Sequence, residues 1–92
     1  MQTYNESSAQ EQLATLPGWT FRNDGIEKRY SFENFVQAFG FMSQVAIFAE
    51  KADHHPEWSN VYNRVDIRLS THDANGLTDK DFSLARQIET LV

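Results

Sequence analysis

All three histidines of the chain, His54, His55 and His72, fall within one segment, residues 50–81. Imidazole is the side chain that gains or loses a proton near neutral pH without assistance, because its unperturbed pKa is about 6.5. The other titratable side chains of this chain need a perturbing environment to do the same. We therefore look for the chemistry of this protein between residues 50 and 81.

Several kinds of site use histidine. A histidine is most often a surface or hydrogen-bonded residue, although the clustering of three argues for more. Imidazole also binds zinc, but His54 and His55 are neighbours that would point to opposite sides of an extended chain. The chain has no cysteine, no His-x-x-x-His pair and no Gly-x-Ser-x-Gly nucleophile motif. General acid–base catalysis by imidazole remains, with Trp58 or Tyr62 able to contact a flat substrate.

Two carboxylates are candidates to assist the imidazoles, and each also has a simpler explanation. Asp81 ends a Thr-x-x-Asp capping box that begins at Thr78, so it is expected to bind the backbone at a helix start. Glu50 lies near a helix end, where it is either solvated or placed to accept an imidazole N–H and fix the tautomer.

Composition limits the function classes. The chain is long enough for a single domain, residues 1–92, and we expect residues 1–7 to be loose. A formal net charge of −5 without a basic cluster argues against direct binding to nucleic acid. The polar start is no signal peptide, and no apolar run approaches the ~20 residues that span a bilayer. We therefore expect a cytoplasmic protein that contacts neither nucleic acid nor a membrane directly.

Helix and strand signals follow the order α-β-β-α-β-β-α. Ser8 and Glu11 form a capping box that predicts a short helix from Ser8. Asn23-Asp24-Gly25 predicts a hairpin between strands 19–23 and 26–30. The remaining predicted elements are a helix from a Ser31 cap to about Ala52, strands 57–62 and 64–71, and a helix opened by Thr78.

Hairpins beside long helices are typical of an α+β fold, here a four-stranded antiparallel sheet with the helices packed on one face. Pairing strand 57–62 with strand 64–71 brings the start of the first strand to the end of the second. His54 precedes the first strand and His72 follows the second. The sequence therefore predicts that these two histidines meet at one rim of the sheet.

The long helix carries more apolar residues than one sheet can cover. One apolar stripe consists of Phe35, Phe39, Met42, Ala46 and Ala49, and a second of Phe41, Val45 and Phe48. We expect the sheet to leave the second stripe uncovered, and we expect a homo-oligomer built partly on this helix or on the sheet edges, with either stripe facing the partner. Gly40, in the middle of this helix, is either a tolerated weak point or a place where another backbone approaches closely.

The residues singled out above stand in one ordered pattern: Glu50-x-x-x-His54-His55-Pro56, then Tyr62, His72 and Asp81. This pattern resembles the signature of the pterin-4a-carbinolamine dehydratases. The segments EKADHHPEWSNVYN, LSTHDANGLT and AFGFM are similar to that family as well. The resemblance extends from about Trp19 to the C-terminus, and the motif shows no departure from the family pattern.

The resemblance implies that the protein dehydrates 4a-hydroxytetrahydropterin, such as 4a-hydroxytetrahydrobiopterin, to quinonoid dihydropterin. This reaction recycles the cofactor of aromatic amino-acid hydroxylases. It also implies a homodimer or homotetramer. Separately, we predict that no metal is required, because the spacing of metal ligands is absent, and that no cofactor is needed, because the dehydration involves no redox group. It assigns His54, His55 and His72 as active-site residues, with Glu50 and Asp81 as supporting acids. Substrate contacts are predicted at Asp53, Pro56, Trp58, Tyr62, Ser70 and Thr71.

Among the histidines, we predict that His54 and His72 transfer protons and that His55 binds and orients the pterin. Two other functions compete with the dehydratase. One is a non-catalytic dimerisation cofactor or partner-binding protein on the same scaffold, and the other is a metal-dependent hydrolase. The complete histidine set favours the dehydratase, because a pure binding protein would not need it.

Overall fold

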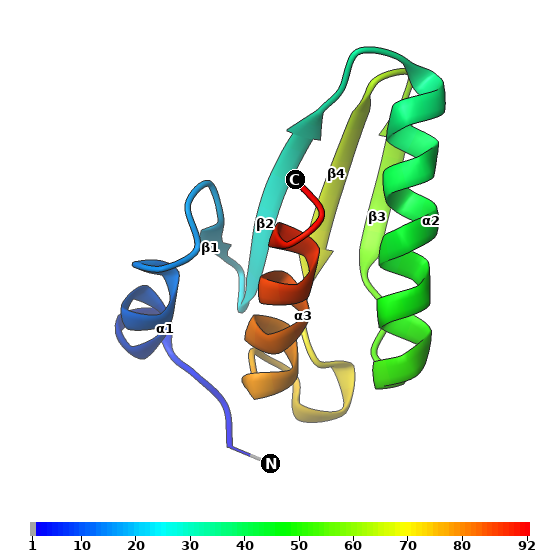
Figure 1. The fold of residues 1–92 in the computed structure, drawn as a ribbon. Coiled ribbons are helices and arrows are strands. Elements are labelled where there is room, and N and C mark those ends of the chain that lie inside the picture. Colours follow the sequence, from blue (N-terminus) through cyan, green and yellow to red (C-terminus); the bar gives the residue numbers. More distant parts are fainter. Residues whose placement is uncertain (1) are drawn as a thin grey trace.

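A computed structural model describes residues 2–92 and has the predicted α+β fold, with a short 3₁₀ turn added between the last strand and the last helix (Figure 1). The elements are α1 (Glu6–Leu13), β1 (Thr20–Arg22), β2 (Gly25–Ser31), α2 (Phe35–Ala52), β3 (Glu57–Val61), β4 (Arg64–Leu69), η1 (His72–Ala74) and α3 (Asp79–Glu89). Along residues 2–92, no helix combines the length and the apolar content needed to cross a membrane.

The four strands form one antiparallel sheet in the order β1-β2-β4-β3. Each hairpin closes through a two-residue turn. Asn23 and Asp24 both have positive φ in the first turn, as a type I′ turn requires, and Tyr62 has positive φ in the second. Helix α2 then carries the chain from the central strand β2 to the edge strand β3, which leaves the start of β3 beside the end of β4.

The core lies between the sheet and the helices on one of its faces, as predicted. Helices α2 and α3 cross the same face of the sheet, whereas α1 lies beside β1 (Figure 1). Alternate residues of β4 point into this layer and are buried, and α3 contributes a matching apolar side. The largest fully buried apolar side chains are Leu16, Ile26, Val45, Val65, Ile67, Leu69, Leu77, Phe82, Leu84 and Ile88. Each such side chain contributes about 1.5–3 kcal/mol by leaving water.

The first helix begins two residues earlier than predicted, at Glu6, with Asn5 as its N-cap. Asn5 Oδ1 accepts a hydrogen bond from the Ser8 backbone N–H at 2.8 Å, and Ser8 Oγ accepts one from the Asn5 N–H at 3.0 Å. Ser8 is therefore the third residue of this capping box and not its cap. Tyr4, in the stretch expected to be loose, pairs with Leu77 through its backbone N–H at 2.9 Å. Met1 lies outside the described residues.

Helix α2 begins at Phe35 with Asn34 as its cap, not at Ser31. Ser31 remains in β2 and pairs with Arg64, so the hydrogen-bonded ladder of the sheet takes precedence over a local capping signal. The predicted second hairpin is also longer than the observed one. Strand β3 ends before Tyr62, which lies in the turn between the two strands. Strand β4 ends at Leu69, and beyond it Thr71 pairs with Gly76 instead of with β3.

The prediction of an uncovered stripe at Phe41, Val45 and Phe48 is wrong. Phe41 and Val45 are buried under the sheet, and Phe48 is half-buried against the core. The large apolar side chains that α2 leaves exposed are Phe35, Val36, Phe39 and Ile47. At about 100° per residue these four positions fall on one side of the helix, opposite the buried side. The helix is therefore apolar on two faces, but the sheet covers the face that we expected to remain open.

Candidate active site

The end of α2 determines where the first two histidines emerge. Asp53 caps the helix in a left-handed conformation with φ of 49°, and its N–H binds the carbonyl oxygens of Ala49 and Glu50. The backbone N–H of His54 then also binds the Ala49 carbonyl, at 3.0 Å, in the manner of a Schellman motif. This tight turn places His54 and His55 at the rim of the sheet, just before β3 begins.

The third histidine reaches the same rim from β4. Glu57, at the start of β3, pairs with Arg68, near the end of β4. Beyond β4, Thr71 and Gly76 exchange two backbone hydrogen bonds, which close a small loop around the 3₁₀ turn that carries His72. The hairpin thus brings the three histidines together in one cavity of about 350 Å³. Its lining residues are Asp53, His54, His55, Pro56, Glu57, Ser70, Thr71, His72, Asp73 and Lys80.

Each imidazole lies against a carboxylate through its Nε2 atom. The shortest contact joins His54 Nε2 to Asp81 Oδ1 at 2.5 Å. The Nε2 atom of His55 lies 2.9 Å from Glu50 Oε1. The third contact, between His72 Nε2 and Glu57 Oε1, is 3.2 Å. Glu50 and Asp81 therefore lie where supporting acids would be needed, and Glu57 is a third carboxylate that the sequence analysis did not single out.

The three pairs differ greatly in their access to water. The side chain of His54 is 9% exposed and that of Asp81 is 0% exposed, whereas His55 and His72 are 61% and 75% exposed. Surface ion pairs contribute little because water and salt screen them. The His54–Asp81 contact is buried, so packing fixes its geometry, whereas the contacts of His55 and His72 are open to water.

Asp81 makes both a capping contact and a contact with an imidazole. It is the third residue of a capping box, since its Oδ2 atom accepts the Thr78 backbone N–H at 3.0 Å. Its other oxygen faces His54. One carboxylate thus ties the first turn of α3 to the residue that follows α2.

The predicted substrate contacts divide into two groups. Asp53, Pro56, Ser70 and Thr71 line the cavity, although Thr71 is buried. Trp58 packs against the core instead, and Tyr62 lies in the turn at the opposite end of β3. Within a single chain, neither aromatic residue lines the histidine cavity. Their contact with a substrate stays a prediction.

Three residues of the cavity were missed by the sequence analysis: Glu57, Asp73 and Lys80. The position of Glu57 immediately after Pro56, at the start of a strand, could have indicated it, because the start of that strand lies beside the end of the next one. Nothing in the local sequence distinguished Asp73 or Lys80 from solvated surface charges. Among residues 2–92, no three His, Asp or Glu side chains are arranged to hold a metal ion.

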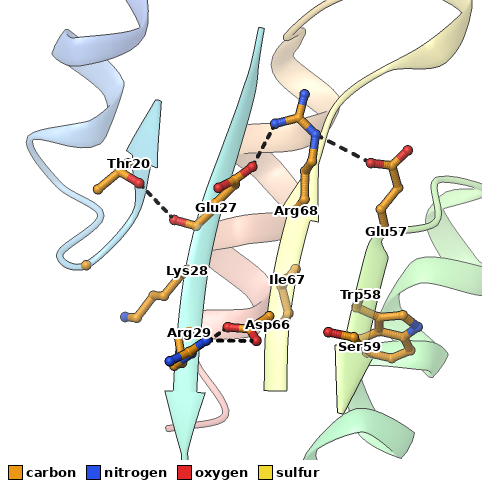
Figure 2. Close-up of a pocket in the computed structure, with 11 residues that line it drawn as sticks. Thr20, Glu27, Lys28, Arg29, Glu57, Trp58, Ser59, Asp66, Ile67 and Arg68 are labelled. Atoms are coloured by element: carbon orange, nitrogen blue, oxygen red, sulfur yellow. Dashed lines mark hydrogen bonds and ion pairs between the residues drawn. The ribbon is translucent and has the colours of Figure 1, made fainter. Parts of the chain in front are cut away.

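A larger hollow of about 570 Å³ lies on the opposite, helix-free face of the sheet. Its charged residues form ion pairs across the strands (Figure 2). Arg68 Nη1 contacts Glu27 at 3.0 Å, and its Nε contacts Glu57 at 3.4 Å. The hydrogen bond between Arg29 and Asp66, 2.7 Å long, lowers the pKa of the Asp66 carboxyl and raises that of the arginine. This hollow contains no histidine and its charges compensate one another, so the histidine cavity is the better candidate.

Glu57 connects the two regions. Its Oε1 atom faces His72 in the cavity, while its Oε2 atom faces Arg68 on the helix-free side (Figure 2). Arg68 is itself held by the carbonyl oxygens of Arg22 and Asn23, at 2.7 and 2.6 Å. The β1–β2 turn therefore anchors the arginine that lies beside the partner of His72.

Comparison with known proteins gives a consistent answer. The family model for pterin 4 alpha carbinolamine dehydratase matches residues 2–91. A protein of Rhizobium rhizogenes, provisionally named pterin-4-alpha-carbinolamine dehydratase, is 59% identical over 81 residues, which cover 86% of this chain and 80% of that protein. A Prochlorococcus marinus protein with the same provisional name is 53% identical over 85 residues, covering 88% of each chain.

Solved structures agree with this similarity. A Brucella melitensis crystal structure described as a transcriptional coactivator/pterin dehydratase superimposes with a TM-score of 0.95 at 44% identity, covering 98% of both chains. A pterin dehydratase-like RuBisCO assembly factor of the alpha-carboxysome shares the fold, with a TM-score of 0.66 at 19% identity over 79% of this chain and 84% of that one. The match of the family model across nearly the whole chain, and the identity to these relatives, show that this protein belongs to the pterin-4-alpha-carbinolamine dehydratase family.

Proposed function

We propose that this protein catalyses the dehydration of 4a-hydroxytetrahydropterin, such as 4a-hydroxytetrahydrobiopterin, to quinonoid dihydropterin and water. The observation that carries the proposal is the meeting of three imidazoles in one cavity, each against its own carboxylate. In the reaction the C4a–O bond breaks, N5 loses its proton, and the N5 electron pair forms the C4a=N5 bond. No electron is transferred to another group, so a general acid and a general base suffice.

His54 is the base in this proposal. A carboxylate can only accept hydrogen bonds, so the pairing with Asp81 keeps the proton of neutral His54 on Nε2. The Nδ1 atom then carries the lone pair that accepts the N5 proton. Nδ1 of His54 has no hydrogen-bond partner among residues 2–92, and none of the buried side-chain nitrogens there lacks a partner. Nδ1 is therefore not fully buried, which supports its exposure to the cavity that His54 lines.

His72 assists the departing hydroxyl group, and His55 binds and orients the pterin. Both imidazoles are exposed on the cavity walls, where a bound molecule can reach them. His72 donates a proton to the leaving oxygen, which departs as water. After the product leaves, His54 releases the proton that it accepted to solvent and His72 takes up a proton from solvent, so the protein ends in its starting state.

The walls of the cavity suit a flat, amide-like ring. Such a ring is bound by backbone hydrogen bonds and apolar surface more than by a single charge. Pro56 offers a rigid apolar edge, and Ser70 and Asp53 offer polar groups beside it. Pro56, Ser70 and Asp53 are the wall residues that we expect to contact the pterin ring.

Stopped-flow measurement tests the proposal directly. The 4a-hydroxytetrahydropterin is generated in the instrument and its loss is followed with and without the protein. A first-order rate that rises in proportion to protein concentration, above the unaided dehydration, is the expected result. A rate that equals the unaided rate at all protein concentrations would refute the proposed activity.

We also propose that the exposed apolar face of α2 is covered by further copies of this chain in a homodimer or homotetramer. Val36 is 77% exposed and Ile47 is 57% exposed, although both are large apolar residues. Gly40 lies on the same face, where an added Cβ atom would meet nothing within 4 Å in the single chain. A second helix can therefore approach closely there, which is the alternative for Gly40 that the sequence left open.

The metabolic role that we propose is the recycling of the cofactor of aromatic amino-acid hydroxylases in the cytoplasm. The alternative is a non-catalytic protein on the same scaffold that binds a partner protein. The exposed apolar face of α2 favours this alternative, because a different protein could bind there. Substrate turnover by the isolated protein separates the two. A protein that binds partners but does not accelerate dehydration would fit the alternative.

A further inference from the structure

We propose that Thr71 is a positioning residue that acts on His54 through Asp81, and does not itself contact the substrate. This inference rests on the proposed function, since it assigns His54 a proton transfer that needs a fixed orientation. It is argued from a different observation, however, which is a buried chain of hydroxyl groups that ends on the carboxylate of Asp81.

The carboxylate of Asp81 is fully buried and accepts three hydrogen bonds. Oδ1 faces His54 Nε2 at 2.5 Å, and Oδ2 accepts from Thr71 Oγ1 at 2.8 Å and from the Thr78 N–H at 3.0 Å. The imidazole therefore contacts a carboxylate whose second oxygen is fixed from two directions. Of these two donors, the threonine hydroxyl is the one that a side-chain substitution can remove without altering the backbone.

The direction of the hydrogen bonds in the chain formed by Thr78, Thr71 and Asp81 is fixed by their chemistry. A hydroxyl has one proton, and Thr71 uses its proton on Asp81. In the 2.8 Å hydrogen bond between the two hydroxyls, Thr78 Oγ1 is therefore the donor and Thr71 Oγ1 the acceptor. Thr78 Oγ1 itself accepts a hydrogen bond from the Lys80 backbone N–H at 3.3 Å. The chain runs from the first turn of α3 through two hydroxyls to the carboxylate. Such aligned bonds polarise one another in a dry interior.

Thr71 also affects His72, the second histidine to which we assign a proton transfer, through its backbone. Its N–H and carbonyl bind Gly76, and its carbonyl also accepts the Ala74 N–H at 3.1 Å. These bonds close the loop that carries His72. The backbone of Thr71 therefore holds the loop that carries His72, and its side chain holds Asp81, the carboxylate partner of His54.

The direct substrate contact that the sequence predicted for Thr71 would require a different environment of its hydroxyl group. A substrate-binding hydroxyl needs an unused donor or acceptor that reaches the cavity. Thr71 is 4% exposed, and its hydroxyl is engaged by Asp81 on one side and Thr78 on the other. A binding role predicts a change in KM, whereas a positioning role predicts a change in kcat with KM unchanged.

The test compares Thr71→Val, which removes the hydroxyl, with Thr71→Ser, which keeps it. For the valine variant we expect kcat to fall by about ten- to a hundredfold, the rate equivalent of one hydrogen bond to a charged group, with KM unchanged. The serine variant should recover most of the loss. The matched control is Thr20→Val, which makes the same substitution on the helix-free face of the sheet.

Proton NMR provides a readout that does not depend on turnover. A short hydrogen bond between an imidazole and a buried carboxylate moves the N–H proton far downfield, and His54→Gln identifies that resonance by abolishing it. We expect Thr71→Val to shift or broaden this resonance, and Thr71→Ser and Thr20→Val to leave it in place. Thr71→Ala carries the same expectation if the valine methyl, set against the carboxylate, prevents folding.

A folded Thr71→Val or Thr71→Ala variant that keeps the downfield resonance and the wild-type kcat would overturn the proposal. A raised KM with an unchanged resonance would overturn it as well, in favour of direct substrate contact. If the wild-type protein shows no turnover at all, the proposed function fails, while the resonance still decides whether Thr71 positions His54.

Discussion

The Nε2 atom of His54 lies 2.5 Å from Asp81 Oδ1, although the two residues are 27 positions apart in the chain. His54 follows the end of α2, and Asp81 lies in the first turn of α3. Because both helices cover the same face of the sheet, their ends meet at the rim where β3 begins and β4 ends. This contact ties the packing of the fold to the orientation of one imidazole.

Replacement of Asp81 by asparagine should therefore affect activity and stability together. An amide at this position cannot accept all three donors, and one of its own N–H groups would face another donor. We expect Asp81→Asn to lower the free energy of unfolding by about 1–3 kcal/mol and to lower kcat. Urea denaturation and steady-state kinetics measure the two effects.

The control for this substitution is Asp24→Asn. Asp24 lies in the β1–β2 turn with φ of 58°, a conformation that asparagine also tolerates. It should match the wild type in both measurements. If Asp81→Asn is as stable and as active as this control, the buried carboxylate has neither of the roles assigned to it.

The exposed histidine next to Pro56 should behave differently from the buried one. His55 contacts Glu50 at the surface and is proposed to bind the pterin. We expect His55→Ala to raise KM several-fold and to change kcat little, with no loss of stability, because a surface contact of this kind contributes about 0–1 kcal/mol. A fall in kcat as large as that of His54→Ala would show that His55 takes part in the chemistry instead.

The apolar face of α2 predicts how assembly can be broken. We expect Phe39→Glu to shift the protein towards monomer in sedimentation experiments, since a charge there would be buried between copies. Gln44→Glu introduces the same charge at an exposed polar position of the same helix and serves as the control. Wild-type protein that sediments as a 10.6 kDa monomer at micromolar concentration would remove the basis of this prediction.

Acid should weaken the fold through a carboxylate far from the cavity. Burial alone would raise the pKa of Glu89, but hydrogen bonds from Lys28, Tyr30 and Trp19 outweigh this effect and hold the pKa below its usual value. A depressed pKa stabilises the folded state above the unfolded pKa, about 4.5, and this stabilisation is lost as the pH falls through the lower folded value. The free energy of unfolding should therefore decline below about pH 4.5.

Urea denaturation at several pH values measures this dependence. Glu89→Gln should be less stable than the wild type at neutral pH and should show a flatter decline in acid. Glu11→Gln, an exposed glutamate of α1, is the matched control and should follow the wild-type curve. Parallel pH curves for Glu89→Gln and the wild type would contradict the assigned role of this carboxylate.

The sequence predicted the element order and the meeting of His54 with His72, because both follow from local signals. Turn residues marked the hairpins, and an antiparallel hairpin necessarily brings the start of one strand to the end of the next. The partners of the imidazoles were harder to predict. Asp81 reaches His54 through the packing of two helices, and Glu57 reaches His72 through strand pairing and a turn whose shape is not encoded in either residue.

The faces of α2 show a second limit of sequence reasoning. Periodicity indicated that the helix is apolar on more than one side, but it did not divide the residues as the structure does: Ala49 of the first stripe is buried, and the exposed face includes Val36 and Ile47, which belong to neither stripe. Which residues the sheet covers depends on the rotation of the helix about its axis, which the whole core determines. Phe41 was assigned to the open side and lies in the core, where its ring centroid is 4.8 Å from that of Tyr30.

The rate of dehydration by His54→Ala, His72→Ala and the double variant tests the central claim most directly. Each single variant should fold, as judged by circular dichroism, and should lose on the order of 10²–10⁴ in the catalysed rate after the unaided rate is subtracted. The double variant should lose little more than either single variant if the two imidazoles act as one unit. If both single variants fold and turn over at nearly the wild-type rate, proton transfer by these histidines is contradicted.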